Sequence, residues 1–353
     1  MYAENWRDIM KIQYALIGIL LTSVAHSANF GLYGNSISAH NIATTQHEIA
    51  NRVFVPMISE VPSAFSRTSE KELDADEYGE MLYYGEFGDD TGVLPLVSGR
   101  NGGDISDNNL RIGWQHSYDK IKFKSHPHVK NTSDLIFAAY ANEFNATRLQ
   151  FFGGYAGSHT KNDVLDIDND GAFIGAYVGK KFGDIELSGM ADFGFAANDI
   201  GASVHRDGFN NFYAGIIGNV AYSYNFYDTV LLRPSLRAGY TWMNSASYKS
   251  DGSVKVTGKD FNLFELSPMF DVLSNIGDGL SVGGHFGYIM NFVGGGRQRA
   301  NSETLSKLNI NNYFEYGISL SQTFNEFSLN INFGRHDGAH SGWNGGAEFK
   351  YVF

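Results

Sequence analysis

The last eleven residues, 343–353, alternate between apolar and polar side chains and constrain the fold more than any other part of the chain. Apolar residues stand two apart, with charged residues between them: Ala347, Glu348, Phe349, Lys350, Tyr351 and Phe353. A period of two predicts a β-strand with one apolar face. In water such a strand would be an exposed edge that invites aggregation. In a bilayer the same strand can close a barrel and turn its apolar face to lipid.

The composition fits a membrane barrel better than a helical membrane protein. The chain has 353 residues, no Cys, 41 Gly, 6 Pro and 14% aromatic residues. Its mean hydropathy of -0.23 is too polar for helical spans, which need about 20 consecutive apolar residues. In a barrel only alternate residues face lipid. The net charge of -12 argues against nucleic acid as a partner, and no residue pattern implies a cofactor.

The N-terminal segment has the features of an export signal. Residues 12–24 are apolar, which is short for a membrane span and typical of a signal-peptide core. Small residues at Ala25 and Ser27 predict cleavage after Ser27 or Ala28. Because Glu4 and Asp8 are unusual in a leader, Met10 is the more natural start. We therefore expect a signal peptide over 1–28, with an uncleaved anchor as the alternative.

Residues 29–107 form a mixed region that we interpret as a short passenger or linker. The spacing of Ile42, Ile49, Val53 and Ile58 predicts a helix over residues 38–58. We expect the segment that fills the pore to be residues 41–60, or, as a second candidate, the acidic residues 70–81.

From Leu110 onward, strand-like segments of about ten residues recur, which is the length that crosses a bilayer at a tilt. Short polar stretches, such as 182–184 and 325–326, alternate with long ones, such as 160–169, 198–208 and 336–342. This alternation predicts an all-β, antiparallel, up-and-down transmembrane barrel over residues 108–353. About twelve strands are expected near 109–120, 134–143, 147–159, 170–182, 184–197, 209–225, 229–244, 260–273, 279–293, 311–324, 326–335 and 343–353.

The faces of these strands separate lipid contacts from lumen contacts. In residues 327–334, for example, four apolar residues oppose three polar residues and a glycine. Charged residues on the polar faces are expected to line the pore: Glu186, Asp192, Arg233, Arg237, Glu265 and Glu315, with Asp271, Glu348 and Lys350 beside them.

The chain resembles the translocator β-domain of autotransporters, the type V secretion family. The resemblance covers residues 147–353 and is carried by the phrase Val220–Tyr240 (VAYSYNFYDTVLLRPSLRAGY) and by the closing segment 343–353. It implies a twelve-stranded barrel in the bacterial outer membrane, with both termini in the periplasm and an N-terminal helix threaded through the pore. It also implies periplasmic chaperones and a barrel-assembly machinery, which would read Phe349, Tyr351 and Phe353 as an assembly signal.

The chain departs from this family in its short passenger region. Passengers are usually long and repetitive, whereas residues 29–107 contain no repeat. A vestigial passenger, a truncated gene and a barrel with another purpose all stay open. An Asn-rich stretch at Asp107–Asn109 leaves self-cleavage as a further possibility of the resemblance.

Two chemical alternatives were weighed against the transport function. Asp166, Asp168 and Asp170 precede Gly171 with the spacing that begins a calcium loop, but the Glu expected at the twelfth position is replaced by Tyr177. His336, Asp337 and His340 fall in an expected outer loop without the spacing of a triad. We therefore expect no catalytic residues, and a solvated acidic turn at Asp166, Asp168 and Asp170, with a calcium site there as the alternative.

The sequence thus predicts a monomeric outer-membrane barrel that translocates or anchors its own N-terminal segment. The alternative is a porin-like barrel, or one that binds ligands through its surface loops.

Overall fold

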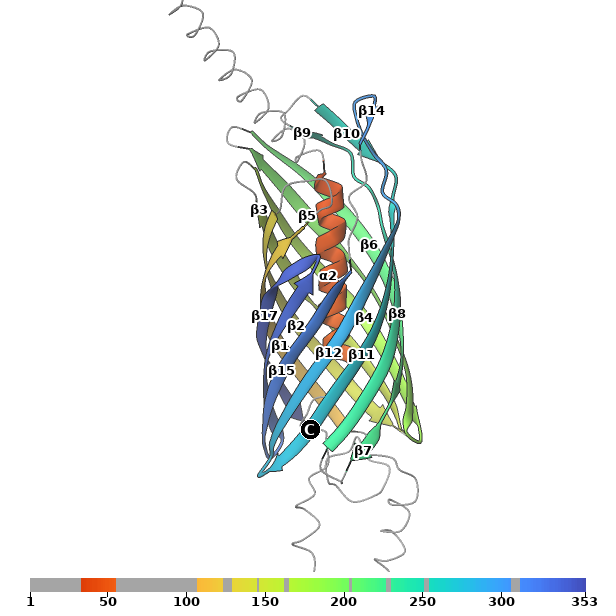
Figure 1. Ribbon diagram of the computed structural model, residues 1–353, viewed down its shortest axis with the longest axis vertical. Helices are drawn as coiled ribbons and strands as arrows, with labels where there is room; N and C mark the ends of the chain where they lie inside the picture. Colours follow the sequence, from red (N-terminus) through yellow and green to blue (C-terminus); the bar gives the residue numbers. More distant parts are fainter. Residues whose placement is uncertain are drawn as a thin grey trace, which may run out of the picture.

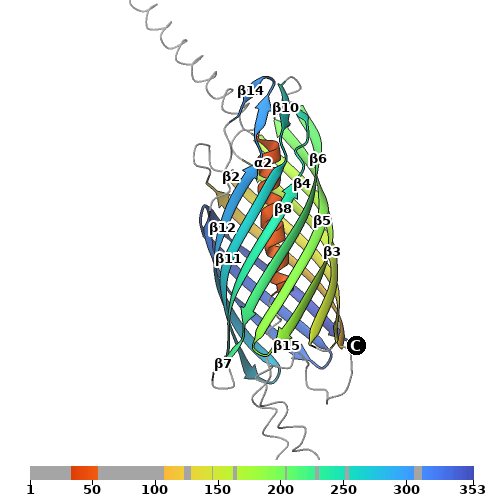
Figure 2. The same ribbon diagram turned by 90° about the vertical axis from the view of Figure 1, so that its right-hand side faces the viewer.

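A computed structural model describes residues 33–54, 107–122, 129–144, 146–161, 165–202, 205–226, 230–250, 254–305 and 312–353. Twelve long antiparallel strands form a tall barrel with one helix inside it, as the two views in Figures 1 and 2 agree. The strands are β1 (Asp107–Ile121), β2 (Val129–Phe144), β3 (Thr147–Lys161), β4 (Leu165–Phe182), β5 (Ile185–Ala202), β6 (His205–Tyr222), β8 (Val230–Met243), β11 (Phe261–Gly277), β12 (Leu280–Gly295), β15 (Tyr313–Phe324), β16 (Phe327–Gly338) and β17 (His340–Val352).

The barrel is closed by its first and last strands. β17 pairs with β1 from Asn109 opposite Val352 to Ile121 opposite His340, and every other pairing joins sequence neighbours. β8 pairs with β11 on one side and β6 on the other, and the short β7 (Tyr224–Phe226) continues β6 along β8. The expected pairing of residues 343–353 with the strand near Leu110 is therefore confirmed.

Alternation divides the side chains of the barrel into two faces. On β16, Phe327, Leu329, Ile331 and Phe333 are exposed outward, while Ser328 lies buried toward the lumen. The same alternation on the other strands builds a belt of exposed apolar side chains around the barrel and a polar interior. Among the described residues, no helix has both the length and the apolar character needed to cross a membrane.

The two ends of the barrel differ, and we name them by their connections. The turn end carries tight connections, such as Asn325-Glu326, where Asn325 adopts a positive φ of 52°. Of the connections between barrel strands, the loop end carries the two longest, 244–260 and 296–312. These contain a second, four-stranded sheet of β9 (Tyr248–Ser250), β10 (Val254–Gly258), β13 (Gln298–Ala300) and β14 (Glu303–Thr304), seen above the barrel in Figure 1.

All twelve expected strands are present, but several expected loops and turns are wrong. Most of residues 160–169 and 198–208 belongs to β3, β4, β5 and β6, and in 336–342 only Ala339 separates β16 from β17. Asn225, the last residue of the expected strand 209–225, lies in the separate short strand β7. The strands continue past the apolar belt, where outward positions become polar and the alternation that marks a strand disappears from the sequence.

The helix α2 (Gly34–Phe54) stands inside the barrel and runs from the loop end to the turn end. It overlaps the first expected pore segment, 41–60, but begins seven residues earlier. The second candidate, 70–81, lies outside the described residues, as does the expected signal peptide over 1–28.

Candidate functional site

The lumen holds α2 against two chemically different walls. One wall, built by β2 to β6, packs large apolar side chains on the helix residues Ile42, Ile49, Val53 and Phe54. These wall residues include Leu135, Phe137, Phe152, Phe173, Tyr177, Met190, Tyr213 and Ile217. Burying this surface away from lumen water stabilises the helix by the hydrophobic effect. The opposite wall holds the helix with charged and amide groups.

At the loop end, the second sheet caps the helix. The Gly34 N–H donates to the Tyr248 hydroxyl at 2.9 Å, and Asn35 donates to the Ala246 carbonyl at 2.9 Å. A first helical turn has free N–H groups, and the Tyr248 hydroxyl satisfies the one of Gly34, while the Ala246 carbonyl holds the Asn35 side chain. Tyr248 also stacks on Phe209 with ring centroids 4.4 Å apart. Burial raises the pKa of Tyr248, so its hydroxyl stays protonated.

In the middle of the lumen, Gln46 is held by two strands. Its amide donates to both carboxylate oxygens of Asp192 at 3.0 and 3.1 Å, and its oxygen accepts from the Thr241 hydroxyl. Strand β6 has a glycine beside this side chain, where a Cβ at Gly215 would crowd Gln46 Nε2 and the Asp192 carboxylate. A side chain at Gly215 would therefore push the Gln46 amide away from Asp192.

His47 bridges two carboxylates of the wall opposite the apolar one. Its Nδ1 lies 2.9 Å from Glu265, and its Nε2 lies 2.7 Å from Glu315. An imidazolium, which donates from both nitrogens, satisfies this arrangement. Asn51 donates to the other oxygen of Glu315 at 2.8 Å and accepts from Arg237 at 2.8 Å.

Toward the turn end, a carboxylate lies between two arginines. Glu348 accepts from Arg52 of the helix at 3.2 Å and from Arg111 of β1 at 2.5 Å. Arg52 also donates to Gln115 at 2.6 Å, and Arg111 donates to the Arg52 carbonyl at 3.0 Å. This group, Arg52, Arg111 and Glu348, is called the arginine–glutamate triad below. It joins the helix to the seam where the barrel closes, because Arg111 lies on β1 and Glu348 on β17.

The last helical residue is held by arginines from β8. Arg233 donates to the Phe54 carbonyl at 3.0 Å and pairs with Glu186 at 3.2 Å. The Arg237 guanidinium lies over the Phe54 ring, 5.2 Å from its centroid. Cationic groups near a helix C-terminus interact favourably with the helix dipole, and they donate hydrogen bonds to its free carbonyl groups.

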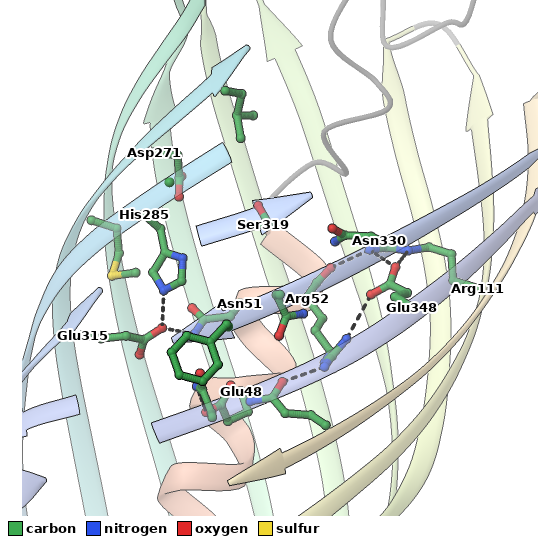
Figure 3. A pocket seen from close by; sticks show the side chains of 17 residues that line it. Glu48, Asn51, Arg52, Arg111, Asp271, His285, Glu315, Ser319, Asn330 and Glu348 are labelled. Carbon is green, nitrogen blue, oxygen red and sulfur yellow. Dashed lines mark hydrogen bonds and ion pairs between the residues drawn. The ribbon is translucent and has the colours of Figure 1, made fainter. Parts of the chain in front are cut away.

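A cavity of about 110 Å³ lies between the turn-end half of α2 and the wall of β11, β12 and β15 to β17 (Figure 3). The small polar residues Ser319, Asn330 and Asn332 leave this space, which the arginine–glutamate triad borders. Arg52 Nε and Arg111 Nη1 have no hydrogen-bond partner among the described residues. A polar cavity of this size suits several water molecules, so the lumen is filled but not dry.

The structure places all six expected pore-lining residues on the inward face of the barrel. Five of them contact α2 directly, and Glu186 acts through Arg233. The sequence interpretation missed Arg111, whose inward direction follows from its position between outward Leu110 and Ile112. It also missed the partners that the helix supplies, Gln46, His47 and Arg52, because no strand-like pattern marks them.

The three aspartates expected in a turn lie on β4, with their side chains outward. Asp168 is bonded to His159 at 2.6 Å, and the Asp170 carboxylate accepts from the Tyr155 hydroxyl. His159, Asp166 and Asp168 bring three potential metal-ligand atoms within 4.8 Å of one another. Asp170 is not part of this group. The calcium interpretation stays a prediction, but a calcium-binding loop is not formed there because these residues continue a strand.

The residues weighed for catalysis are also not in a loop. His336 and Asp337 belong to β16, and His340 begins β17. The two histidines point inward, where His336 bonds to Asp119 at 3.1 Å and the His340 ring lies 4.4 Å from that of His40. The expected assembly residues Phe349 and Phe353 are exposed outward, and Tyr351 stacks on Phe327 at 4.8 Å.

Comparison with known proteins gives one family and a set of similar folds. The family model described as autotransporter beta-domain matches residues 125–340. The structure is similar to the translocator domain of the autotransporter NalP from Neisseria meningitidis, with a TM-score of 0.58, 14% identity, and coverage of 79% of this chain and 96% of that chain. It is also similar to the β-domain of the Bordetella autotransporter BrkA, with a TM-score of 0.52, 10% identity, and coverage of 70% and 99%. At these identities the likeness concerns the fold. A search of curated proteins gave no match.

Proposed function

The chain belongs to the autotransporter β-domain family, and from this premise we propose that α2 is the end of a segment that the barrel has carried to the cell surface. The protein is an outer-membrane translocator β-domain, a transport unit and not an enzyme. Its apolar belt faces lipid. The porin-like alternative is the weaker one, because the helix occupies the lumen over most of its height.

The observation that carries the proposal is the direction of α2. Short turns face the periplasm in outer-membrane barrels, and long loops face outside. The turn end is therefore assigned to the periplasm and the loop end to the cell surface. Gly34 lies at the loop end, whereas Phe54 and the start of β1 at Asp107 lie at the turn end. The N-terminal end of α2 thus points outward, toward the cell surface.

The contacts of α2 support its role as an anchor. Polar groups hold it at the loop end, in the middle and at the turn end, and the apolar wall buries its other side. A segment that only passed through would not need side-chain partners from so many strands. We propose that the lumen guides the segment during passage and then fixes its last residues.

Cysteine labelling tests the direction of α2, because the chain has no Cys of its own. In intact cells, a membrane-impermeant maleimide is expected to label N29C as well as it labels the loop-end control S247C, at an exposed residue. A second control at the turn end, D278C, is expected to react only after the cells are lysed. If N29C reacts only together with D278C, the outward direction is contradicted.

We also propose that the terminal strand is read by the barrel-assembly machinery and that periplasmic chaperones deliver the chain to it. Phe349, Tyr351 and Phe353 form an outward aromatic row at the turn end. The closed ring of strands leaves no free edge in the main sheet, which supports a monomeric barrel.

The double variant Y351A/F353A is expected to lose most of its folded barrel in cells yet to refold from urea into detergent. The matched control is F193A/F212A, which removes two outward aromatics, 60% and 58% exposed, from β5 and β6. For each variant, the heat-dependent shift of the barrel on a gel measures the folded fraction, both in cells and after refolding. Equal loss in both variants would mean that exposed aromatics matter everywhere and that the terminal strand carries no signal.

A further inference from the structure

Three lysines stand directly opposite one another on the outer surface of the barrel. Lys120 of β1 pairs in register with Lys130 of β2, and Lys130 pairs with Lys161 of β3. All three side chains are exposed. We call them the lysine row. Like charges directly opposite on neighbouring strands destabilise a sheet, so the stability of the fold does not explain why three lysines stand together here.

The lysine row lies at the loop end, a fixed distance beyond the apolar belt. On each of its strands, the last large exposed apolar or aromatic residue stands six positions away: Trp114 on β1, Ile136 on β2 and Tyr155 on β3. Six residues span about 20 Å of strand. At a tilt of 35–45° this is about 15 Å along the barrel axis. The head-group layer of one leaflet is only about 5–8 Å thick, so the row lies beyond it, at the height of the saccharides that an outer-leaflet glycolipid carries.

Nearby acids leave the lysine row with uncompensated positive charge. The closest acid in register is Asp166, opposite Lys161. Closer to the belt, Asp134 is hydrogen-bonded to His116 at 2.9 Å and Asp168 to His159 at 2.6 Å. Among the described residues, no ion pair within 4.0 Å includes Lys120, Lys130 or Lys161. On the other side, Lys120 faces Ser341 of β17.

We propose that the lysine row binds the phosphate groups of a phosphorylated saccharide lipid in the outer leaflet. The ammonium groups are compact point charges that suit phosphate. The ligand is a lipid and not free phosphate, because the row faces outward on the strands whose belt the lipid chains cover, so a lipid anchored beside the barrel holds its phosphorylated saccharide at the row. The inference uses the position of the barrel in the membrane and makes no use of α2, so it can fail while the proposed function holds.

Binding is tested with the full chain refolded in detergent and mixed with purified lipopolysaccharide. The variant K120Q/K130Q/K161Q keeps the size of the side chains but removes the charges. The matched control is K249Q/K255Q, because Lys249 and Lys255 are also opposite each other, but in the second sheet. Three lysines near a charged surface contribute about fivefold each, or roughly 100-fold together.

The expected result is a loss of roughly 100-fold in lipopolysaccharide affinity for the triple variant and little change for the control. Lipopolysaccharide stripped of its phosphates should bind the unaltered chain as weakly as phosphorylated lipopolysaccharide binds the triple variant. Neither inorganic phosphate nor phosphatidylglycerol vesicles should compete at matched phosphate concentration. The proposal would be overturned if the triple variant bound lipopolysaccharide as tightly as the unaltered chain. It would also be overturned if the stripped lipid bound as tightly as the phosphorylated one, or if either phosphate source competed effectively. A temperature melt of each variant without lipid confirms that the barrel is folded.

Discussion

Deletion of α2, residues 34–54, is expected to raise the conductance of the barrel in planar lipid bilayers by roughly tenfold or more, since a helix about 10–12 Å across leaves the lumen. The intact chain should be nearly closed, passing ions only through spaces such as the 110 Å³ cavity beside the helix. This is the largest functional effect that the structure predicts.

The physical reason is that the barrel wall does not depend on the helix. Each of the twelve long strands pairs with two neighbours, and β1 and β17 close the ring without any contribution from α2. Without α2, lumen charges such as Asp192 and Glu315 lose helix partners but gain water, which solvates them. The apolar wall loses its cover, which lowers stability but leaves the strand pairing intact.

A deletion of equal length separates loss of the helix from loss of chain. Removing residues 70–90 takes out as many residues as α2 contains and keeps every described contact of the helix. That variant should conduct no more than the intact chain. An unchanged conductance after deletion of α2, with the barrel folded, would show that the helix does not close the pore.

The strands could be predicted from the sequence because outward and inward residues face different solvents. Lipid requires Phe327, Leu329 and Ile331, and the lumen accepts Ser328 and Asn330, so the period of two is strong wherever the belt is. Beyond the belt both faces are polar. There the sequence around Asp166 and Asp168 predicts a turn, although strand β4 continues through both residues.

The helix was harder to predict because it lacks the single apolar stripe of a surface helix. Within Gly34–Phe54, apolar Ile42 and Ile49 meet the wall of β2 to β6, while His47 and Arg52 meet charged groups on the opposite wall. Gln46 binds Asp192 on β5 and Thr241 on β8. A buried polar residue such as these can be predicted only when the residue that it binds is known. That partner lies on a distant strand, and the pairing is visible only after the barrel has closed.

The substitution E348A is expected to lower the free energy of unfolding by about 3–5 kcal/mol, the usual cost of leaving buried charges without their partner. Glu348 and Arg111 are 3% and 1% exposed, and Arg52 is 6% exposed, so water cannot replace the lost carboxylate at low cost. Urea titration of the refolded barrel, followed by tryptophan fluorescence, measures the change. In contrast, D337A should change stability by less than about 0.5 kcal/mol, because its partner Arg335 is 3.9 Å away and both side chains are more than half exposed.

Two further variants separate the helix contact from the seam contact of the arginine–glutamate triad. R52M keeps the Arg111–Glu348 pair, so it should cost less than E348A and chiefly loosen the helix, which limited proteolysis detects. The triple variant R52M/R111M/E348M removes every charge of the triad, and buried ion pairs replaced by apolar groups are often neutral or stabilising. It should therefore recover most of the stability that E348A loses. If it is less stable than E348A, the cost lies in lost packing or hydrogen bonds at the seam, and unpaired charge is not the cause.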